Sequence, residues 1–428
     1  MIKPANITYL IGSLDRGGAE GQVTELLRRL DRTRFQPRLI LFEPGARERV
    51  AGLVEDVFSL DVPQEPANAF WRRSYRALKV FMRLCGHLRR NRPDILHAHL
   101  PASCILGLPA GRLCGIPVLI GSRRSLTSAY READWIYSAL DRLITHCCHF
   151  MVGNADAVSR ELVEIDGLAI DKVGTIHNGV DTVRFRPERS AFWRAHYGWK
   201  DDEVVFGMVA NFFGYKRHVD FVEAAVVLHR RFPLARFVMV GQDRGELPVV
   251  RAAIAGSGLS DFIQVAPSTS RPEDLYAAMD VLVSCSDSEG FSNVILEAMA
   301  SGKPVIATAA GGNTEAVVEG STGFLVPCRS PWAPVKAAER LLEDRALREL
   351  MGRNGRQRAE EHFSVLEMVH AHEQLYARLL EQRCSRVAFR SEAHLMERES
   401  TTASVETFDS LEVDARTVRA SARNAEPF

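Results

Sequence analysis

Apolar runs of strand length alternate along the chain with stretches whose apolar residues recur at helical spacing. In the first half, the strand-like run 7–11 leads through a glycine-containing loop into a helical pattern over 26–30. The second half repeats this order, with a strand-like run at 204–210 and a helical pattern from Phe221 to Phe232. Such alternation is typical of a parallel sheet covered by helices on both faces. We therefore predict an α/β chain built from two Rossmann-like units.

One strand-to-helix junction in the second half carries two carboxylates. The apolar run 281–284 ends in a polar loop, and a helical pattern begins near Asn293. The unpaired N–H groups and the dipole of a helix N-terminus attract anions, and phosphate is the usual occupant. Glu289 precedes this N-terminus, whereas Glu297 lies about one turn inside the helix and can accept hydrogen bonds from hydroxyl groups.

A nucleotide sugar fits this junction. Its diphosphate would lie on the N–H groups, its sugar hydroxyls toward Glu289 and its ribose toward Glu297. The candidate donor-binding residues of the junction are Gly290, Phe291, Ser292, Asn293, Val294 and Glu297. A simpler interpretation stays open, because acidic side chains near a helix start are favoured by the dipole in any protein.

The bulk properties are those of a globular enzyme with two domains. At 428 residues the chain exceeds one ordinary core, and 46% hydrophobic and 25% charged residues are typical globular values. Basic and acidic residues each number 54, which argues against a general nucleic-acid binder. The eight cysteines show no paired framework, so a reducing cytoplasm is the expected compartment. We expect neither a signal peptide nor a membrane-spanning helix.

Neighbouring histidines and cysteines could suggest zinc, at 146–149 and at His97 and His99. Adjacent Cys147 and Cys148 lack the C-x-x-C spacing that turns two thiolates toward one ion. We therefore predict no metal site and interpret these residues as partly buried and structural.

An extended set of motifs resembles the retaining glycosyltransferases of family 4. Their glutamate pair with seven intervening residues is followed here, as in that family, by GKPVIAT (302–308), a GG-x-x-E turn (311–315) and STGFLVP (321–327). The segment TIHNGVDTVRFRP (175–187) is similar to the linker that joins the two domains of the family. The resemblance, which covers 7–380, implies two Rossmann-like domains facing each other across a cleft, the GT-B architecture, with a C-terminal helix crossing back to the first domain.

The resemblance also implies a division of the chain. We predict an acceptor-side domain over 1–180, a nucleotide-sugar-binding domain over 181–365 and a crossing helix over 366–383. Residues 384–428 are rich in Ser, Thr, Glu, Arg and Ala, with few apolar residues, which predicts a disordered tail.

Further donor contacts follow from the resemblance. Lys216 falls on the family lysine that neutralises the donor diphosphate, where a cation stabilises charge growing on the leaving group. The family often has an Arg five residues earlier, where this chain has Asn211. Arg217 is then the candidate for the second charge, and a diphosphate held by one cation fewer is the alternative. Gly17 and Gly18 match the glycine loop of the first domain, although two glycines can also serve a turn alone.

The acceptor side is marked by His99, at the end of a predicted strand where parallel sheets collect ligands. The family has a similar H-x-H, in which His97 is expected to face the core. A second histidine of the family is replaced by SRRS (122–125), whose Arg123 and Arg124 either contact a phosphate or form a surface pair. The resemblance implies transfer with retention, in which the departing phosphate accepts the acceptor's proton without a protein nucleophile or a metal ion. The catalytic candidates are Glu289, Lys216 and His99.

Residues 71–92 contain many basic and no acidic residues. Their apolar residues recur at helical spacing, which predicts an amphipathic helix with one buried face and one basic face. The apolar set is Trp71, Tyr75, Leu78, Met82, Cys85 and Leu88. Contact with an anionic membrane and an ordinary core-packed helix with a solvated basic side are both consistent with this pattern.

We therefore predict a glycosyltransferase that moves a sugar from a nucleotide-diphosphate sugar to a saccharide or lipid-linked acceptor. It would need no cofactor and would serve cell-surface polysaccharide or glycolipid synthesis at the inner face of the membrane. The alternatives are a nucleotide-sugar epimerase or a glycogen-synthase-like enzyme on the same fold, and an inactive donor-binding scaffold at the membrane. The lysine-glycine loop of glycogen synthases is not seen, and intact Glu289, Lys216 and Glu297 weigh against the scaffold.

Overall fold

The structure is a computed structural model. It describes residues 3–14, 17–43, 50, 52–62, 70–126, 135–188 and 190–385, without the side chains of 70–75, 135–138 and 191. Residues 1–374 form one compact unit and residues 375–428 another, and the architecture below concerns the first.

The first domain is built on a parallel sheet of seven strands in the order β3-β2-β1-β4-β5-β6-β7. The strands are β1 (Ala5–Ile11), β2 (Phe35–Leu41), β3 (Val57–Ser59), β4 (Ile95–His99), β5 (Val118–Arg123), β6 (Phe150–Gly153) and β7 (Val173–Thr175). Every residue of β4 and β5 is buried. Such continuous burial is typical of parallel strands that are covered on both faces.

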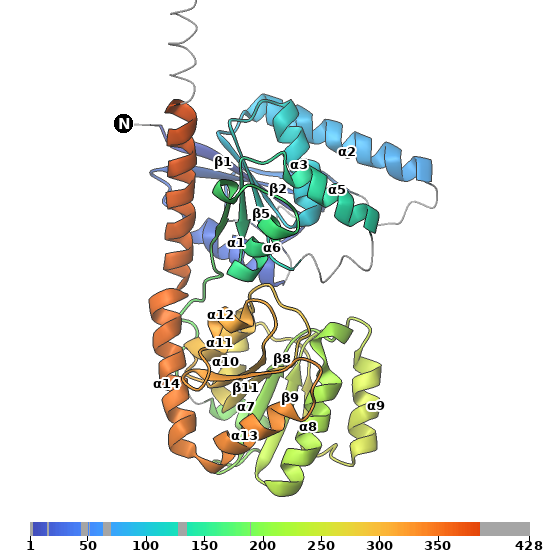
Figure 1. Cartoon of the computed structure of the whole chain (residues 1–428), viewed down its shortest axis with the longest axis vertical. Helices are drawn as coiled ribbons and strands as arrows, with labels where there is room; N and C mark the ends of the chain where they lie inside the picture. Colours follow the sequence, from blue (N-terminus) through green and yellow to red (C-terminus); the bar gives the residue numbers. More distant parts are fainter. Residues whose placement is uncertain are drawn as a thin grey trace, which may run out of the picture. The chain divides into compact units, whose positions relative to one another are not determined.

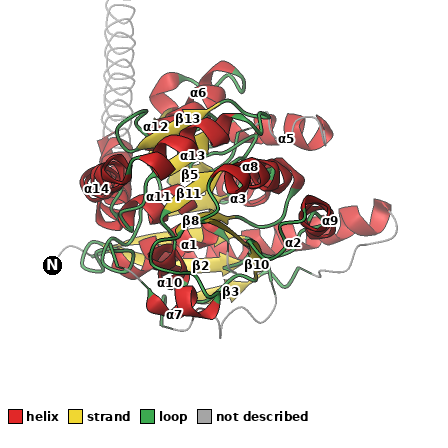
Figure 2. Ribbon diagram, turned by 90° about the horizontal axis from the view of Figure 1, so that it is seen from below, coloured by secondary structure: helices red, strands yellow, loops and turns green. Residues whose placement is uncertain are grey.

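The helices of this domain follow its strands in turn (Figure 1). They are α1 (Gly18–Arg29), α2 (Phe70–Asn91), α3 (Pro101–Leu113), α5 (Trp135–Thr145), α6 (Asp156–Glu164) and the short η2 (Ile170–Lys172). Figure 2 shows helices on either side of the strands. Because β1 has β2 on one side and β4 on the other, the strand order reverses beside β1, which is where ligands of open α/β sheets bind.

The second domain repeats the design with a six-stranded parallel sheet in the order β10-β9-β8-β11-β12-β13. Its strands are β8 (Val204–Val209), β9 (Ala235–Val240), β10 (Ile263–Ala266), β11 (Val281–Ser284), β12 (Val305–Thr308) and β13 (Gly323–Val326). Its helices are α7 (Ala191–His196), η3 (Gly214–Lys216), α8 (His218–Arg231), α9 (Leu247–Ser257), α10 (Pro272–Ala278), α11 (Asn293–Ala300), α12 (Asn313–Ala316), α13 (Ala333–Glu343) and α14 (Arg345–His362). The predicted pair of Rossmann-like units is thus confirmed.

The chain passes between the domains twice, and the two passages pair with each other. The N–H of Val180 donates to the carbonyl of Phe363 over 2.8 Å, and the N–H of Val365 donates to the carbonyl of Val180 over 3.0 Å. A helix then runs over 365–385. Its Glu373 accepts the N–H of Asp31 over 2.7 Å, which confirms that the C-terminal helix crosses back to the first domain.

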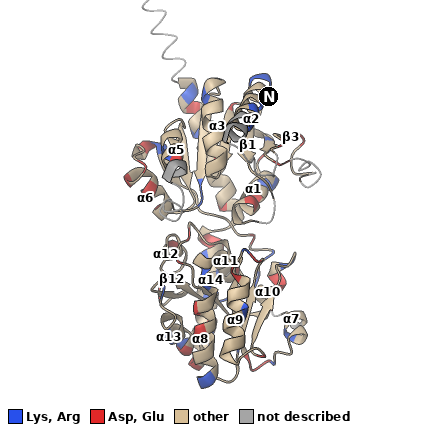
Figure 3. Cartoon of the chain, turned by 90° about the vertical axis from the view of Figure 1, so that its right-hand side faces the viewer, with Lys and Arg blue, Asp and Glu red and all other residues tan. Residues whose placement is uncertain are grey.

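The predicted domain limits at residues 180, 365 and 383 remain predictions. Of the tail expected to be disordered, residues 386–428 lie outside the described part of the chain. Basic and acidic residues are interspersed over both domains (Figure 3). No helix of the described residues is both long and apolar enough to cross a bilayer.

The amphipathic helix predicted at 71–92 is observed as α2, but its buried face is narrower than expected. Cys85 and Leu88 are buried, as the pattern required, whereas Leu78 and Met82 are 58% and 56% exposed. The side chains of Trp71 and Tyr75 lie outside the description. The interpretation of one continuous buried face is therefore wrong, because the described side chains of α2 that pack on the core of the domain begin at Val80.

Candidate active site

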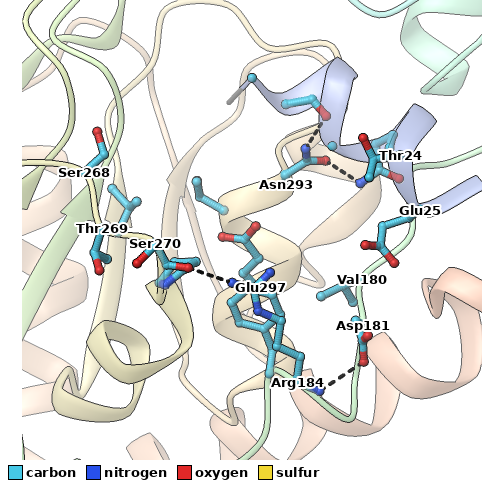
Figure 4. A pocket seen from close by; sticks show the side chains of 18 of the residues that line it. Thr24, Glu25, Val180, Asp181, Arg184, Ser268, Thr269, Ser270, Asn293 and Glu297 are labelled. Atoms are coloured by element: carbon cyan, nitrogen blue, oxygen red, sulfur yellow. Dashed lines mark hydrogen bonds between the residues drawn. The ribbon is translucent and has the colours of Figure 1, made fainter. Parts of the chain in front are cut away.

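A cavity of about 520 Å³ opens between helix α1 and the carboxyl ends of the second-sheet strands. Its walls come from α1, the linker after β7, the loops after β8, β9 and β10, and the start of α11. Figure 4 shows Thr24 and Glu25 of α1 across from Glu297 of α11, with the loop Ser268–Ser270 on another side. The volume lies within the range of small-molecule sites, which is roughly 300–1,000 Å³.

The start of α11 has the geometry of an anion cradle. Ser292 stands at the N-cap with an extended backbone, φ −81° and ψ 111°, and its side chain makes no capping hydrogen bond. Within the described chain, the backbone N–H groups of Gly290, Phe291 and Ser292 donate to no carbonyl and no side chain. Unpaired N–H groups at the positive end of a helix dipole attract phosphate. Asn293 and Val294 of the first helical turn line the cavity beside them.

Gly290 permits the close approach of a neighbouring backbone segment as well as that of a ligand. A Cβ on Gly290 would lie 2.2 Å from the carbonyl oxygen of Arg124, which belongs to the first domain. On the other side, the N–H of Gly312 donates to the Gly290 carbonyl over 3.0 Å. The cradle is therefore fixed between the backbones of both domains.

Glu297 lies in the cavity wall one turn into α11. Its carboxylate accepts a hydrogen bond from the hydroxyl of Tyr276 over 2.7 Å. Burial raises the pKa of Glu297 to about 7, although Tyr276 and Arg184 act in the opposite direction. The carboxyl group thus changes charge near neutral pH, and its ionised form can accept hydrogen bonds from a ribose.

Lys216 and Glu289 contact each other through an ion pair between Nζ and the carboxylate. Burial disfavours the charge of Lys216, but Glu289 and Tyr215 outweigh it, so the pKa of Lys216 is raised. Neither Lys216 nor Glu289 lines the cavity itself. A phosphate that binds Lys216 must therefore compete with Glu289 for the ammonium group.

Asn211 and Arg217 have different environments. Asn211 lines the cavity, and its Oδ1 accepts the N–H of Gln242 over 3.0 Å, which ties the loop after β8 to the loop after β9. Arg217 adopts a left-handed backbone with φ 59° and grips Asp220 of α8 through two hydrogen bonds of 2.8 and 3.1 Å. Arg217 is absent from the cavity wall. Arg217, like Lys216, stays a predicted contact of the diphosphate, and a diphosphate held by one cation fewer stays the alternative.

Gly17 and Gly18 reach the cavity from the first domain. Gly17 is the N-cap of α1, with an extended backbone, and Gly18 is the first residue of the helix. The carbonyl oxygen of Gly18 accepts a hydrogen bond from the Nδ2 of Asn293 over 2.9 Å. The predicted glycine loop and the predicted cradle, 275 positions apart in the chain, thus lie side by side.

His99 is not among the residues that line the cavity. Its side chain is fully buried at the end of β4, with ring centroids 4.0 Å from His97 and 5.9 Å from Tyr9. Burial, followed by the charges of His97 and Arg124, holds the pKa of His99 well below its usual range. His97 is also fully buried and contacts the hydroxyl of Ser122 over 2.7 Å, so it faces the core as expected.

The two arginines after β5 have structural partners. Arg123 is 2% exposed and forms ion pairs with Asp141 and Asp166, so it is neither a surface residue nor a cavity residue. A buried guanidinium of this kind requires paired carboxylates. Arg124 donates through Nη1 to the Oδ1 of Asn178 over 2.7 Å.

Three residues could in principle share a metal ion, because ligand atoms of Asp156, His177 and Glu315 lie within 4.8 Å of one another. The Glu315 carboxylate, however, accepts the N–H groups of Asp156 and Ala157 over 2.7 and 2.8 Å and that of His177 over 2.9 Å. These bonds satisfy the first turn of α6. Glu315 therefore serves as a helix cap donated by the second domain to the first.

The sequence analysis missed several residues of the cavity wall. Gln22 of α1 is 6% exposed, and its position beside Val23 and one turn before Leu26, both buried, was an available signal. Arg184 lines the cavity and donates to Glu273 over 2.7 Å. The hydroxyl of Ser268 is buried without a partner in the described chain. Tyr276, the partner of Glu297, gave no sequence signal that distinguishes it from a core aromatic residue.

Comparisons with known proteins agree with this geometry. A family model described as Glycosyl transferases group 1 matches residues 190–358, and one described as Glycosyltransferase Family 4 matches residues 16–184. The D-inositol 3-phosphate glycosyltransferase of Paenarthrobacter aurescens is 30% identical over 281 residues, covering 63% of this chain and 69% of that protein. The chain belongs to glycosyltransferase family 4. It is accordingly a glycosyltransferase of a retaining family that uses a nucleotide-sugar donor.

Two further proteins place this glycosyltransferase among known relatives. The capsular polysaccharide biosynthesis glycosyltransferase CapM of Staphylococcus aureus is 22% identical over 295 residues, covering 67% of this chain and 77% of that protein. The crystal structure of Anabaena HepE in complex with UDP-glucose has a TM-score of 0.76 at 20% identity, over 88% of this chain and 99% of HepE. This structural likeness confirms the GT-B fold.

Proposed function

We propose that this glycosyltransferase takes its sugar from a uridine-diphosphate donor and transfers it, with retention, to a saccharide or lipid-linked acceptor. The observation that carries the proposal is the cradle of unpaired N–H groups at Gly290–Ser292, which stands at the N-terminus of the helix whose Glu297 lines the cavity. A diphosphate on the cradle places a ribose at Glu297, because both groups belong to one short helix. Uracil is the first nucleotide base to test, and UDP the first nucleotide, because HepE binds UDP-glucose.

The side chains divide the work of transfer. Lys216 stabilises the charge that grows on the departing diphosphate, and the helix N-terminus adds the field of its dipole. Glu289 holds a hydroxyl of the transferred sugar once Lys216 turns to phosphate. Gly17 and Gly18 bring the first-domain backbone close to the diphosphate. His99 supports the acceptor side from the core, without contact to the cavity.

The names of the relatives indicate only the broad chemical class of the acceptor. One relative is named for D-inositol 3-phosphate and another for capsular polysaccharide, so hydroxyl-rich acceptors of both kinds are the first to test. We place the enzyme in cell-surface polysaccharide or glycolipid synthesis, at the cytoplasmic face of the membrane. Exposed Leu78 and Met82 on α2, beside exposed Lys79, supply the surface for this contact.

The donor proposal is tested by thermal unfolding with UDP, GDP, ADP and their common sugar conjugates. A ligand that binds only the folded protein raises its stability with the logarithm of concentration over Kd. UDP and at least one UDP-sugar should raise the Tm, and Glu297→Ala should reduce the shift, while Glu164→Ala at an exposed position of α6 should not. Stabilisation by GDP or ADP alone would contradict the uridine assignment.

A further inference from the structure

The two passages between the domains meet at Gly179. A Cβ on this residue would lie 2.6 Å from the Cα of Val365 and 3.1 Å from the carbonyl oxygen of Ser364. Only a glycine therefore fits between the first passage and the second. Because the N–H of Val180 donates to the carbonyl of Phe363 and the N–H of Val365 donates to the carbonyl of Val180, the paired passages form the hinge about which the domains can move.

Gln22 of helix α1 in the first domain forms hydrogen bonds with this hinge. The N–H of Gly179 donates to Oε1 of Gln22 over 2.8 Å, and Nε2 of Gln22 donates to the carbonyl of Gly179 over 2.9 Å. The same Nε2 donates to Oδ1 of Asn293 over 3.2 Å. One buried carboxamide thus connects the first domain, the hinge and the start of the donor-site helix α11.

Two more carboxamides complete a cluster, which we call the amide cluster and define as Gln22, Asn178 and Asn293. Nδ2 of Asn178 donates to Oδ1 of Asn293 over 2.7 Å and to the carbonyl of Phe291 over 3.0 Å. Nδ2 of Asn293 donates to the carbonyl of Gly18 over 2.9 Å. Both polar atoms of the Asn293 side chain are therefore engaged by protein groups. The Asn293 side chain thus contributes to the donor site by positioning the start of α11.

We propose that Gln22 is a positioning residue that holds the cleft closed before the donor arrives, and that it does so through the amide cluster. Opening the cleft must break the bonds that join Asn293 to Gln22 and to Gly18 together, because Asn293 belongs to the second domain and both partners belong to α1 of the first. The closed arrangement keeps the Gly17–Gly18 turn against the diphosphate cradle. The part of this inference that concerns donor affinity rests on the proposed function.

A preorganised cleft has a distinct kinetic signature. The apparent Kd of a ligand equals its intrinsic Kd divided by the fraction of protein in the competent state. Lowering that fraction weakens donor binding, but saturating donor restores the closed state. Loss of Gln22 should therefore raise the donor KM and leave kcat nearly unchanged, whereas general damage to the active site would lower kcat.

The test uses the full chain with Gln22→Leu, which removes all three hydrogen bonds at similar volume, and Gln22→Glu, which keeps the acceptor for the Gly179 N–H. Gln36→Leu, at an exposed position of β2, is the matched control. Small-angle X-ray scattering gives the radius of gyration without ligand and with saturating UDP, and calorimetry gives the UDP affinity. Circular dichroism and the Tm identify any variant that fails to fold, in which case Gln22→Glu decides.

The wild type and Gln36→Leu should keep one radius of gyration with and without UDP. Gln22→Leu should be larger without UDP and contract to the wild-type value with it, and its UDP Kd should rise roughly 10- to 100-fold. Equal unliganded radii for wild type and both Gln22 variants would overturn the proposal, as would a wild type that itself contracts on UDP. A wild type that bound no UDP would contradict the proposed donor, and the unliganded radii would still decide the role of Gln22.

Discussion

Nζ of Lys216 and the carboxylate of Glu289 form an ion pair between the segments that precede α8 and α11. The group assigned to the leaving phosphate and the group assigned to the transferred sugar are therefore in contact before any substrate binds. The pair keeps Lys216 charged in a largely buried position, where an isolated ammonium would be costly. Donor binding has to exchange Glu289 for phosphate at Lys216, which frees Glu289 for a sugar hydroxyl.

Replacement of Lys216 by alanine should lower kcat by about 10²- to 10³-fold, because an electrostatic contact made chiefly in the transition state is lost. Steady-state kinetics with the donor identified by thermal unfolding measure this change. Lys200→Ala, at an exposed position before β8, should leave kcat unchanged. A Lys216→Ala enzyme as fast as the wild type would remove Lys216 from the mechanism.

Binding of UDP should strengthen as the pH rises through about 7. The pKa of Glu297 is raised from its ordinary value of 4.5 to about 7 in the folded protein, and a ribose hydroxyl needs the ionised acceptor. Calorimetric titrations between pH 5.5 and 8.5 measure the slope, which approaches about tenfold per unit below the pKa. Glu297→Gln removes this part of the slope, and identical pH profiles for both proteins would contradict the assignment.

The same raised pKa has a consequence for stability. Between pH 4.5 and 7 the folded protein binds more protons at Glu297 than the unfolded chain does. The contribution of this group to the free energy of unfolding therefore falls as the pH rises across that window, and it is most favourable below pH 4.5. Wild type and Glu297→Gln should diverge in urea-unfolding free energy across the window in this direction.

Transfer should survive a chelator, because Lys216 and the N–H groups of the cradle meet the charge of the diphosphate. The assay is sugar transfer after dialysis against EDTA, with and without added magnesium or manganese. Activity that disappears and returns with either ion would show that the diphosphate is held by a metal. Asp156, His177 and Glu315 would then be the first group to vary.

Binding to anionic vesicles should require α2 and decrease with salt. Each basic residue near an anionic surface contributes on the order of 1 kcal/mol, and salt screens that attraction. Cosedimentation with phosphatidylglycerol vesicles should be lost in the triple variant Lys79→Glu, Arg89→Glu, Arg90→Glu and weakened by Met82→Ser. Absence of sedimentation of the wild type at low salt would leave α2 as an ordinary surface helix.

The alternation of apolar runs was enough to predict both parallel sheets, because strands buried on two faces have a continuous apolar pattern. The junction of β11 and α11 was predictable for a similar reason, since Glu289, Asn293 and Glu297 are close in the chain. Contacts over long separations were not predictable in this way. Gln22 meets its partners Gly179 and Asn293 across 157 and 271 positions.

Burial caused the other differences. His99 ends a central strand, as expected, but its ring is buried against the stacked ring of Tyr9 and the tilted ring of His97. Arg123 faces inward because Asp141 and Asp166, 18 and 43 positions away, neutralise it there. Helical spacing identified α2, yet it does not show how much of the helix packs on the core of the domain. The exposure of Leu78 and Met82 therefore became visible only in three dimensions.

A crystal structure of the protein with UDP bound tests the donor site most directly. We expect diphosphate oxygens within hydrogen-bond distance of the N–H groups of residues 290–293, and ribose hydroxyls on the carboxylate of Glu297. We also expect that Lys216 has left Glu289 for a phosphate oxygen. UDP seated outside the cavity, or with its ribose away from Glu297, would contradict the assignment of the donor site.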